Sequence, residues 1–470
     1  MSNDPVVLAI VGLYLVGMLA IGVWVARRKI ASADDFMVAG RRLPWFVLAA
    51  TLAATEVGGG SSMGVVKKAY GEWGLGAAWY IWTMALTFLV FAWLAPTLTR
   101  TRCRTIPQYF SQRYGPASAV VTAVLMIAAL IGLTAVQMVA TGLVVSVMTG
   151  AGFRLAVLAA GLIVTIYTYW GGMWSVSLTD FVQWFFIVIG LAAAIPYAVG
   201  AGGGVQPVLA ALPPEATSLL SKIGVGEILS LCAIYVTSFL VGQEAIQRLY
   251  SAKDERHARR GALATSGFYL LFGFIPPALG LLALALTRQG VLQVGELTRL
   301  GDNAVLPLLA QACLPAPLTG VLFAGLISAT MSSADSNLLG AASIWANDLM
   351  PLGLRRELTP EGAMIQSRRA VLVIGAAATV VAALNFEDLI TVLKFAFSLR
   401  AAGTFFPFVL GHFWKRGSNA GALASLLGAT AVMAIFMALN ARPLGLDPVL
   451  PALATGLALY VGGSLATDRG

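Results

Sequence analysis

The feature that most constrains this chain is a series of long apolar runs that recurs along its whole length. Thirteen runs are found, at about 5–26, 44–70, 73–99, 117–149, 153–169, 175–200, 226–247, 262–287, 317–348, 367–384, 387–413, 418–439 and 449–466. A run of about 20 apolar residues is long enough for a helix to cross the hydrocarbon core of a bilayer. The runs therefore predict an all-α polytopic membrane protein with about 13 transmembrane helices.

The composition excludes most other classes of protein. Hydrophobic residues make up 59% of the 470 residues and charged residues only 11%, against about 25% charged in a soluble domain. Such a chain cannot be disordered, a coiled coil or a secreted disulfide scaffold, nor can it cover its apolar surface as a cytosolic enzyme would. The connections are too short for an extramembrane catalytic domain, so we expect one transmembrane domain over 1–470.

The basic residues predict the topology. The first run ends in Arg27-Arg28-Lys29 without a small-residue cleavage site, which favours a retained span over a signal peptide. With the N-terminus outside, loops on the inner side collect 21 of the 30 lysines and arginines, Arg248 among them. Because positive residues favour the cytoplasmic side, we expect the N-terminus outside and the C-terminus in the cytoplasm.

Two runs are interrupted by glycine. Gly58-Gly59-Gly60 lies inside the second run and Gly242 inside the seventh. Glycines at mid-membrane weaken a helix and free backbone groups that lipid cannot satisfy, although close helix packing is the alternative reading. Breaks five spans apart are typical of an inverted five-plus-five repeat. The expected repeats cover about 44–200 and 226–413, with 1–30 and 418–470 as peripheral helices.

The ninth run carries oxygen-bearing groups on one helical face. The carbonyl of Ala329 and the hydroxyls of Ser332, Ser333 and Ser336 share this face, with Asp335 close by. Hard oxygen ligands suit a dehydrated alkali cation, whereas the alternative is that the hydroxyls bond to carbonyls of their own helix. A carboxylate within a span is functional by default, which favours the cation site.

Two further acids, Glu56 and Asp180, lie within spans and are candidates for ion or substrate contact. Lys394 and Arg400 are the obvious basic residues within a span, and Arg400 could pair with an acid or bind a substrate carboxylate. The sequence has no phosphate-binding loop, zinc-protease motif or nucleophile elbow. We therefore expect no enzyme activity and no cofactor, with an ion gradient as the energy source for transport.

Several motifs together resemble the solute:sodium symporter family. They are Phe36-Met-Val-Ala-Gly-Arg-Arg, the stretch 54–64, Tyr169-Trp-Gly-Gly-Met-Trp-Ser-Val-Ser-Leu-Thr-Asp, Gln247-Arg248, and Phe323-Ala-Gly with Met331-Ser-Ser-Ala-Asp-Ser. The residues of these motifs are most similar to those of the choline-transporter branch. The resemblance implies a LeuT-like fold with a ten-helix inverted-repeat core, located in a bacterial inner membrane.

The resemblance also implies two ion sites. The first sodium would be bound by the carbonyls of Ala54, Val57 and Ala329 and by the hydroxyls of Ser332 and Ser333. A second sodium, present in only some relatives, would be bound by Asp180, Ser332, Asp335 and Ser336.

The family's substrate pocket lies beside the two breaks. Here it would include Glu56, Gly58, Ser61, Trp79, Gln137, Phe239 and Gln243. The positions that match the aromatic cage of the choline branch are Glu56, Leu133 and Gly242, so the cage itself is not reproduced. Glu56 favours an amine or other cationic group, while Arg400 or free N–H groups at a break would suit the carboxylate of an amino acid.

These observations predict a sodium-coupled symporter that imports a small polar organic solute by alternating access. The alternatives are a proton-coupled carrier of the same fold, using Glu56, Asp180 and Asp335, and a solute-sensing membrane protein. The expected partners are the solute, the sodium ion and the lipid bilayer, with neither nucleic acid nor an obligate protein partner.

Overall fold

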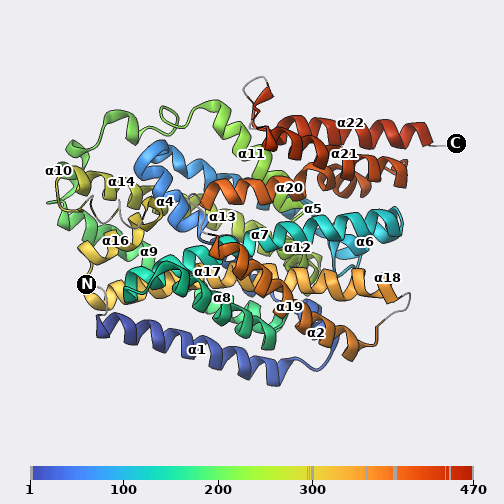
Figure 1. The fold of residues 1–470 in the computed structure, drawn as a ribbon, viewed down its shortest axis with the longest axis horizontal. Helices are drawn as coiled ribbons and strands as arrows, with labels where there is room; N and C mark the ends of the chain where they lie inside the picture. Colours follow the sequence, from blue (N-terminus) through green and yellow to red (C-terminus); the bar gives the residue numbers. More distant parts are fainter. Residues whose placement is uncertain are drawn as a thin grey trace.

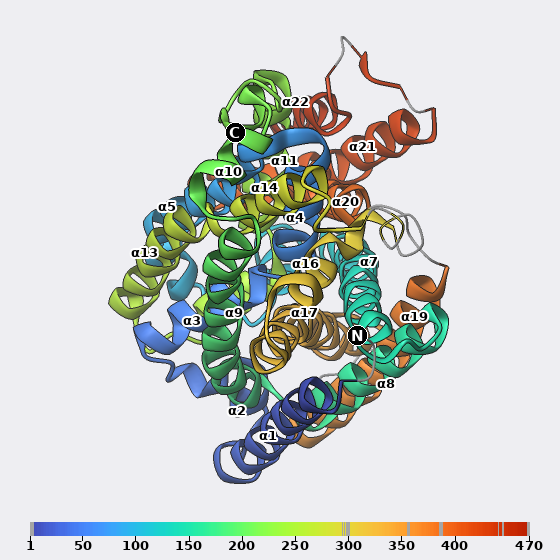
Figure 2. The ribbon, with the colours of Figure 1, turned by 90° about the vertical axis from the view of Figure 1, so that its left-hand side faces the viewer.

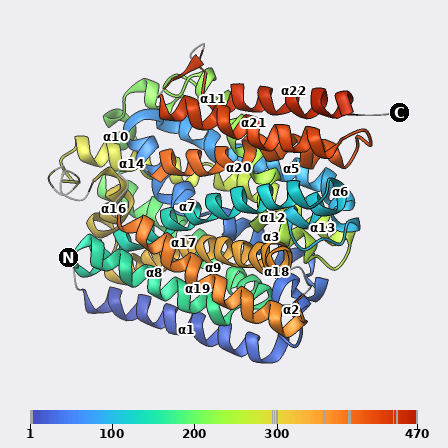
Figure 3. The same cartoon turned by 45° about the vertical axis from the view of Figure 1, so that its right-hand side comes forward.

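Helices occupy the described part of every apolar run that the sequence contains. The computed structural model describes residues 4–293, 295, 297, 301–354, 358–384, 389–439, 441–443 and 446–467. The long helices run mostly along one direction, and the two chain ends lie at opposite ends of the bundle (Figures 1 and 3). Within the described residues no strand forms, and one isolated bridge joins Leu43 to Ala252.

The longer helices form the body of the bundle, and shorter ones connect them. The longer helices are α1 (Pro5–Lys29), α3 (Trp45–Glu56), α5 (Ala78–Arg100), α7 (Pro116–Thr149), α8 (Phe153–Trp170), α9 (Met173–Ala201), α11 (Val225–Leu240), α13 (Glu255–Phe272), α14 (Ile275–Arg288), α17 (Ala316–Ile344), α19 (Pro360–Ala383), α20 (Leu389–Gly411), α21 (Asn419–Ala438) and α22 (Val449–Thr467). The shorter ones include α2 (Ala33–Val38), η1 (Ala39–Arg41), η2 (Gly60–Gly64), α4 (Val65–Lys68), η3 (Ala69–Trp73), η4 (Gly74–Ala77), α6 (Ile106–Arg113), α10 (Val205–Ala211), η5 (Pro214–Thr217), α12 (Gln243–Tyr250), η6 (Asp302–Ala304), α16 (Val305–Cys313), η7 (Trp345–Leu349) and α18 (Met350–Leu354).

The long apolar helices set the number of possible membrane crossings. Among the described residues, eleven helices are long and apolar enough to cross a bilayer, or up to twelve if a bent pair counts as one span. One of the eleven is the 41-residue stretch Gly60–Arg100, which is interrupted at Gly74 by a backbone φ of 56° and ψ of −140°. The count of thirteen therefore stays a prediction.

Helix α17 lies near the centre of the bundle when it is viewed along the helix axes (Figure 2). It packs against α9, α7 and α1, and small residues let these helices approach closely. A Cβ added at Gly325 would lie 2.6 Å from the backbone oxygen of Phe186 on α9. In the same view α1 lies at one edge and α21 and α22 at the opposite edge. The face of α17 that carries the serines is thus held in the interior.

Both predicted breaks occur in the structure. Helix α3 ends at Glu56, and Val57 leaves helical geometry with φ −83° and ψ 74° before helix resumes at Gly60. The second break lies between α11 and α12, whose axes differ by 45°, with Gly242 in an extended conformation. Each break interrupts the helical hydrogen bonds inside the bundle, where groups of the protein rather than lipid can satisfy the freed backbone. At the first break the hydroxyls of Ser332 and Ser333 donate to the carbonyl oxygens of Ala54 and Thr55.

Candidate functional site

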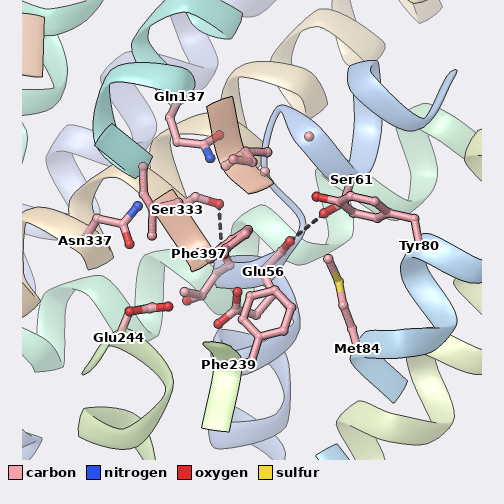
Figure 4. Close-up of a pocket in the computed structure, with 15 residues that line it drawn as sticks. Glu56, Ser61, Tyr80, Met84, Gln137, Phe239, Glu244, Ser333, Asn337 and Phe397 are labelled. Atoms are coloured by element: carbon pink, nitrogen blue, oxygen red, sulfur yellow. Dashed lines mark hydrogen bonds between the residues drawn. The ribbon is translucent and has the colours of Figure 1, made fainter. Parts of the chain in front are cut away.

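A cavity lies between the two breaks and is walled by α5, α7, α17 and α20 (Figure 4). Its empty volume is about 350 Å³. Its lining residues are Thr55, Glu56, Gly58, Gly60, Ser61, Tyr80, Met84, Leu133, Gln137, Phe239, Glu244, Ser333, Asn337, Leu393 and Phe397. Of the seven residues predicted for the substrate pocket, Glu56, Gly58, Ser61, Gln137 and Phe239 line this cavity.

Close contacts at the first break favour its three consecutive glycines. A Cβ at Gly58 would lie 2.6 Å from Oε1 of Gln137, and one at Gly59 would lie 2.5 Å from the Cβ of Ala140. A Cβ at Gly60 would come within 2.2 Å of Leu393. The break therefore fits closely against α7 and α20 because its glycines have no Cβ atoms. The same glycines serve both the break and the close packing of the helices.

We expect the Gly59→Ala variant to be destabilised by about 1–3 kcal/mol, because an extra carbon in a well-packed interior forces neighbours apart. The thermal unfolding midpoint of the purified protein measures this. Gly71→Ala is the matched control, since nothing lies within 4 Å of a Cβ there. Equal midpoints for the two variants would contradict the close packing of the break.

Four of the five residues predicted for the first sodium are drawn together by hydrogen bonds. The hydroxyl of Ser332 lies 2.8 Å from the carbonyl oxygen of Ala54 and 3.0 Å from that of Ala329. The hydroxyl of Ser333 lies 2.5 Å from the carbonyl oxygen of Thr55 and 3.1 Å from that of Ala329. Val57 caps α3 next to them. Oxygens of α3 and α17 thus form one cluster, and none of its ligands is itself charged.

The residues predicted for the second sodium also lie together, but they surround the guanidinium group of Arg248. Arg248 donates from Nη2 to Oδ2 of Asp180 at 2.9 Å and to the hydroxyl of Ser336. The Oδ1 of Asp335 accepts from Ser336 at 3.1 Å. Within the described residues, Oδ1 of Asp180 and Oδ2 of Asp335 have no hydrogen-bond partner. One guanidinium therefore lies with two carboxyl groups, each of which has an oxygen without a partner.

Arg248 belongs to this cluster, although the topology prediction assigned it to an inner loop. In the structure it is fully buried on α12. It also donates to the hydroxyl of Thr51 on α3 at 2.9 Å and to the carbonyl oxygen of Glu244 at 3.0 Å. The signal that could have found it is its place directly after the second break, where a charged residue would still lie at membrane depth.

A second buried ion pair borders the cavity. Nη1 of Arg400 on α20 lies 2.7 Å from Oε1 of Glu244, and Nε donates to the hydroxyl of Ser238 at 2.7 Å. These contacts hold α11 and α12 together across the break. Glu56 is the other carboxylate on the cavity wall, and its buried Oε1 has no partner among the described residues. The cavity wall therefore presents a buried carboxyl oxygen without a partner.

The rest of the cavity wall offers an amide and aromatic surface. Oε1 of Gln137 accepts from the backbone N–H of Gly59 at 2.7 Å, which orients the amide beside the break. Phe239 and Phe397 have ring centroids 5.0 Å apart, and Tyr80 lies on the same wall. Figure 4 shows Phe239, Phe397 and Glu56 together at the cavity. Phe397 and Tyr80 were not predicted as site residues, since nothing in their runs distinguishes them from core aromatics.

Two predicted substrate residues lie elsewhere. Trp79 does not line the cavity, and its Nε1 donates to the carbonyl oxygen of Leu219 at 3.1 Å. Oε1 of Gln243 accepts from the backbone N–H of Ile106 at 2.9 Å, and Nε2 donates to the carbonyl oxygen of Arg104 at 3.2 Å. Gln243 therefore joins α12 to the connection between α5 and α6. Five of the seven residues that the resemblance implied therefore line the cavity, and Trp79 and Gln243 do not.

Comparisons with known proteins agree on one group of transporters. The profile of the sodium:solute symporter family matches residues 36–428. The chain is 26% identical to the sodium/glucose cotransporter of Vibrio parahaemolyticus, over 97% of this chain and 89% of that protein. It is 26% identical to the sodium/pantothenate symporter of Escherichia coli, over 96% and 94%. Identity to the human high affinity choline transporter 1 is 28%, over 80% and 67%.

Solved structures show the same fold. A Na⁺-coupled sialic acid symporter in a substrate-bound outward-open state matches with a TM-score of 0.82 and 19% identity, over 98% of this chain and 97% of that one. MhsT in complex with L-phenylalanine matches with a TM-score of 0.56 and 16% identity, over 89% and 98%. The predicted LeuT-like fold is confirmed.

Proposed function

The chain belongs to the sodium:solute symporter family, and from that membership we propose that it imports a small organic solute bearing a protonated amine, driven by sodium entry. Sodium-coupled transport across a membrane follows from the family. The protonated amine goes beyond what the family implies, and this part of the proposal rests on the residues of the cavity. We also propose that the N-terminus faces outward and the C-terminus the cytoplasm of a bacterial cell, which is the orientation that the basic residues favour.

We place the first sodium in the oxygen cluster between α3 and α17. Carbonyl oxygens at the C-terminal end of a half-helix carry partial negative charge and have lost their helical partners. The hydroxyls of Ser332 and Ser333 already touch these carbonyls. A hydroxyl has one hydrogen and two lone pairs, so rotation of the hydrogens exposes lone pairs to the ion. Sodium bound there would fix the broken span against α17 and complete the neighbouring cavity.

We place a second sodium beside Arg248, at the oxygens of Asp180 and Asp335 that have no partner. The guanidinium compensates one of the two carboxylates, and an isolated charge inside the bundle is costly. One monovalent cation would balance the remaining charge. The support for this position is the pair of unpartnered oxygens.

Sodium activation of uptake is then expected to have a Hill coefficient near two, and Asp335→Asn should lower it toward one while uptake stays sodium-dependent. The variant removes the uncompensated charge but leaves the Arg248–Asp180 pair. Asp348→Asn is the control, because that acid is also buried but accepts from Thr105 outside the cluster. A coefficient of one in the unmodified protein would contradict the second site.

The observation that supports a protonated amine on the substrate is the unpartnered Oε1 of Glu56. Glu244 and Arg400 form an ion pair, whereas Glu56 is a carboxyl group of the cavity wall with no ion-pair partner among the described residues. A carboxylate oxygen accepts hydrogen bonds and donates none, and a protonated amine offers both the donor and the positive charge. The rings of Phe239 and Tyr80 line the cavity and suit a cationic group with an apolar body. The Arg400 guanidinium lies over the ring of Phe397, 4.9 Å from its centroid. Polyols would leave the charge of Glu56 uncompensated.

The test is thermal unfolding of the purified protein with amines, amino acids, carboxylates and sugars, in sodium or potassium chloride at equal ionic strength. A ligand of the folded state raises the unfolding midpoint. We expect stabilisation by amines in sodium and none by carboxylates or sugars. Stabilisation by sugars or carboxylates alone would exclude the amine. Amine binding that responds to pH but not to sodium would favour the proton-coupled alternative.

A further inference from the structure

A second cavity lies away from the helix breaks, at the end of the bundle where the C-terminus lies (Figure 1). It is formed by α2, the connection between α5 and α6, η7, α18 and the start of α19, and its empty volume is about 1420 Å³. The charged and amide side chains on its wall are Asp34, Arg41, Arg102, Arg104, Gln108 and Asn347. Among the described residues, three guanidinium groups and one carboxylate therefore face one space.

The arginines are positioned by specific contacts. Arg41 donates to the carbonyl oxygens of Tyr250 at 3.1 Å and Arg102 at 2.8 Å. Nη2 of Arg104 lies 2.7 Å from Oδ1 of Asp34. Arg102 is exposed and has no ion-pair partner among the described residues. Asp34 compensates the charge of Arg104, whereas carbonyl oxygens orient Arg41 without neutralising it. The positive charges of Arg41 and Arg102 therefore remain uncompensated on the described part of the cavity wall.

The positive groups are close enough to repel one another. Burial lowers the pKa of the Arg41 guanidinium, Asp34 raises it, and the neighbouring charges of Arg104 and Arg102 lower it again. Like charges held together in this way are unfavourable unless a counter-charge lies between them. An anion in the cavity would supply that counter-charge.

The backbone around the cavity is strained. Ala39, Arg41 and Arg102 have φ values of 48°, 54° and 53°, and they are all of the non-glycine residues with positive φ that the structure describes. The left-handed conformation costs an L-residue roughly 1–2 kcal/mol. At Arg102 it presents the carbonyl oxygen to Arg41. Strain of this kind persists where surrounding contacts impose it, and it is concentrated at binding and switch sites.

We propose that this cavity binds a phosphate-bearing anion, either the headgroup of an anionic lipid from the adjacent leaflet or a soluble phosphate compound. Guanidinium groups bind phosphate oxygens through paired hydrogen bonds, and the three arginines come from two segments, η1 and the connection between α5 and α6. The bound anion would join η1 to the α5–α6 connection at the end of the bundle where Gln243 also joins α12 to that connection. This proposal does not depend on which solute is transported.

The test uses the full-length purified protein in a neutral detergent. Its unfolding midpoint is compared in sodium phosphate and sodium chloride at equal ionic strength, and in micelles with phosphatidylglycerol or phosphatidylcholine. We expect phosphatidylglycerol, phosphate or both to raise the midpoint by a few degrees. Arg102→Gln should lose most of this shift, because it removes the guanidinium with no structural partner. Arg28→Gln, an exposed arginine of α1 at the same end, is the matched control and should retain the shift.

A shift with phosphatidylglycerol but not with phosphate identifies the lipid headgroup as the source. A shift with phosphate, whether or not phosphatidylglycerol also gives one, identifies soluble phosphate compounds. Leu358→Glu places a carboxylate on the cavity wall without removing an arginine, and it should reduce the shift as Arg102→Gln does. The proposal is overturned if no anion shifts the midpoint, if Arg102→Gln and Leu358→Glu keep the full shift, or if Arg28→Gln loses as much.

Discussion

The Ser332→Ala/Ser333→Ala double variant is expected to lose sodium-stimulated uptake. Each hydroxyl contacts a carbonyl of the first break and shares Ala329 as an acceptor. A hydrogen bond or ligand contact to a charged group contributes about 1.5–3 kcal/mol, so removing two should weaken sodium binding by roughly 100-fold or more. Uptake of substrate at increasing sodium concentrations measures the change.

Ser328→Ala is the control for this double variant. Ser328 lies on the same helix and is fully buried, but its hydroxyl donates to the carbonyl oxygen of Ala324 rather than to α3. It should therefore keep its sodium activation. Because the two serines also tie α3 to α17, the unfolding midpoint must be measured as well. Normal sodium activation in the folded double variant would contradict the assignment of the first sodium to this cluster.

The Glu56→Gln variant is expected to lose amine binding while sodium binding in the absence of substrate changes little. The substitution keeps the shape of the side chain and removes the charge. Truncating one partner of a buried charge pair costs about 2–5 kcal/mol, which corresponds to a loss of amine affinity of roughly 30-fold or more. Equilibrium binding of the amine found in the stability screen measures it, with sodium affinity measured separately.

Glu72→Gln is the matched control for Glu56→Gln. Glu72 follows the same break, but its side chain is 60% exposed and pairs with Lys68 outside the cavity. Its loss should leave amine affinity unchanged. If Glu56→Gln instead weakened sodium binding more than amine binding, Glu56 would belong to the ion site and the amine would lose its main support.

The proposed sites also explain how the two ligands depend on one another. The carbonyls of Ala54 and Thr55 reach the oxygen cluster, and the next residue, Glu56, lines the substrate cavity. Sodium that fixes the end of α3 would therefore fix Glu56 in place. By linkage, the amine must raise sodium affinity by the same factor that sodium raises amine affinity.

Much of the fold could be predicted from the sequence because lipid imposes simple rules. Apolar runs located the helices, and Gly58–Gly60 and Gly242 located both breaks, since glycine at mid-membrane needs a reason. The motifs identified the family, and the family profile confirms it. The face of α17 that carries Ser332 and Ser333 followed from helical spacing alone. In each case the signal is local, and no distant contact was needed to read it.

The remaining features depend on contacts between distant parts of the chain. Arg248 reads as a loop arginine because the helix continues past the apolar run, and its partner Asp180 lies 68 positions earlier. Arg400 could have bound substrate, but it pairs with Glu244 across the second break. Lys394 pairs with Glu227 and Asp447 outside the cavity. Such pairings are set by the three-dimensional arrangement of the helices.

The most direct test of the account is uptake of the amine into proteoliposomes against its own concentration gradient. With sodium outside and potassium inside, we expect the labelled amine to accumulate, and collapse of the sodium gradient with an ionophore should release it. Liposomes with potassium on both sides and a proton gradient of equal size should show no accumulation. Accumulation driven by protons without sodium would contradict the account.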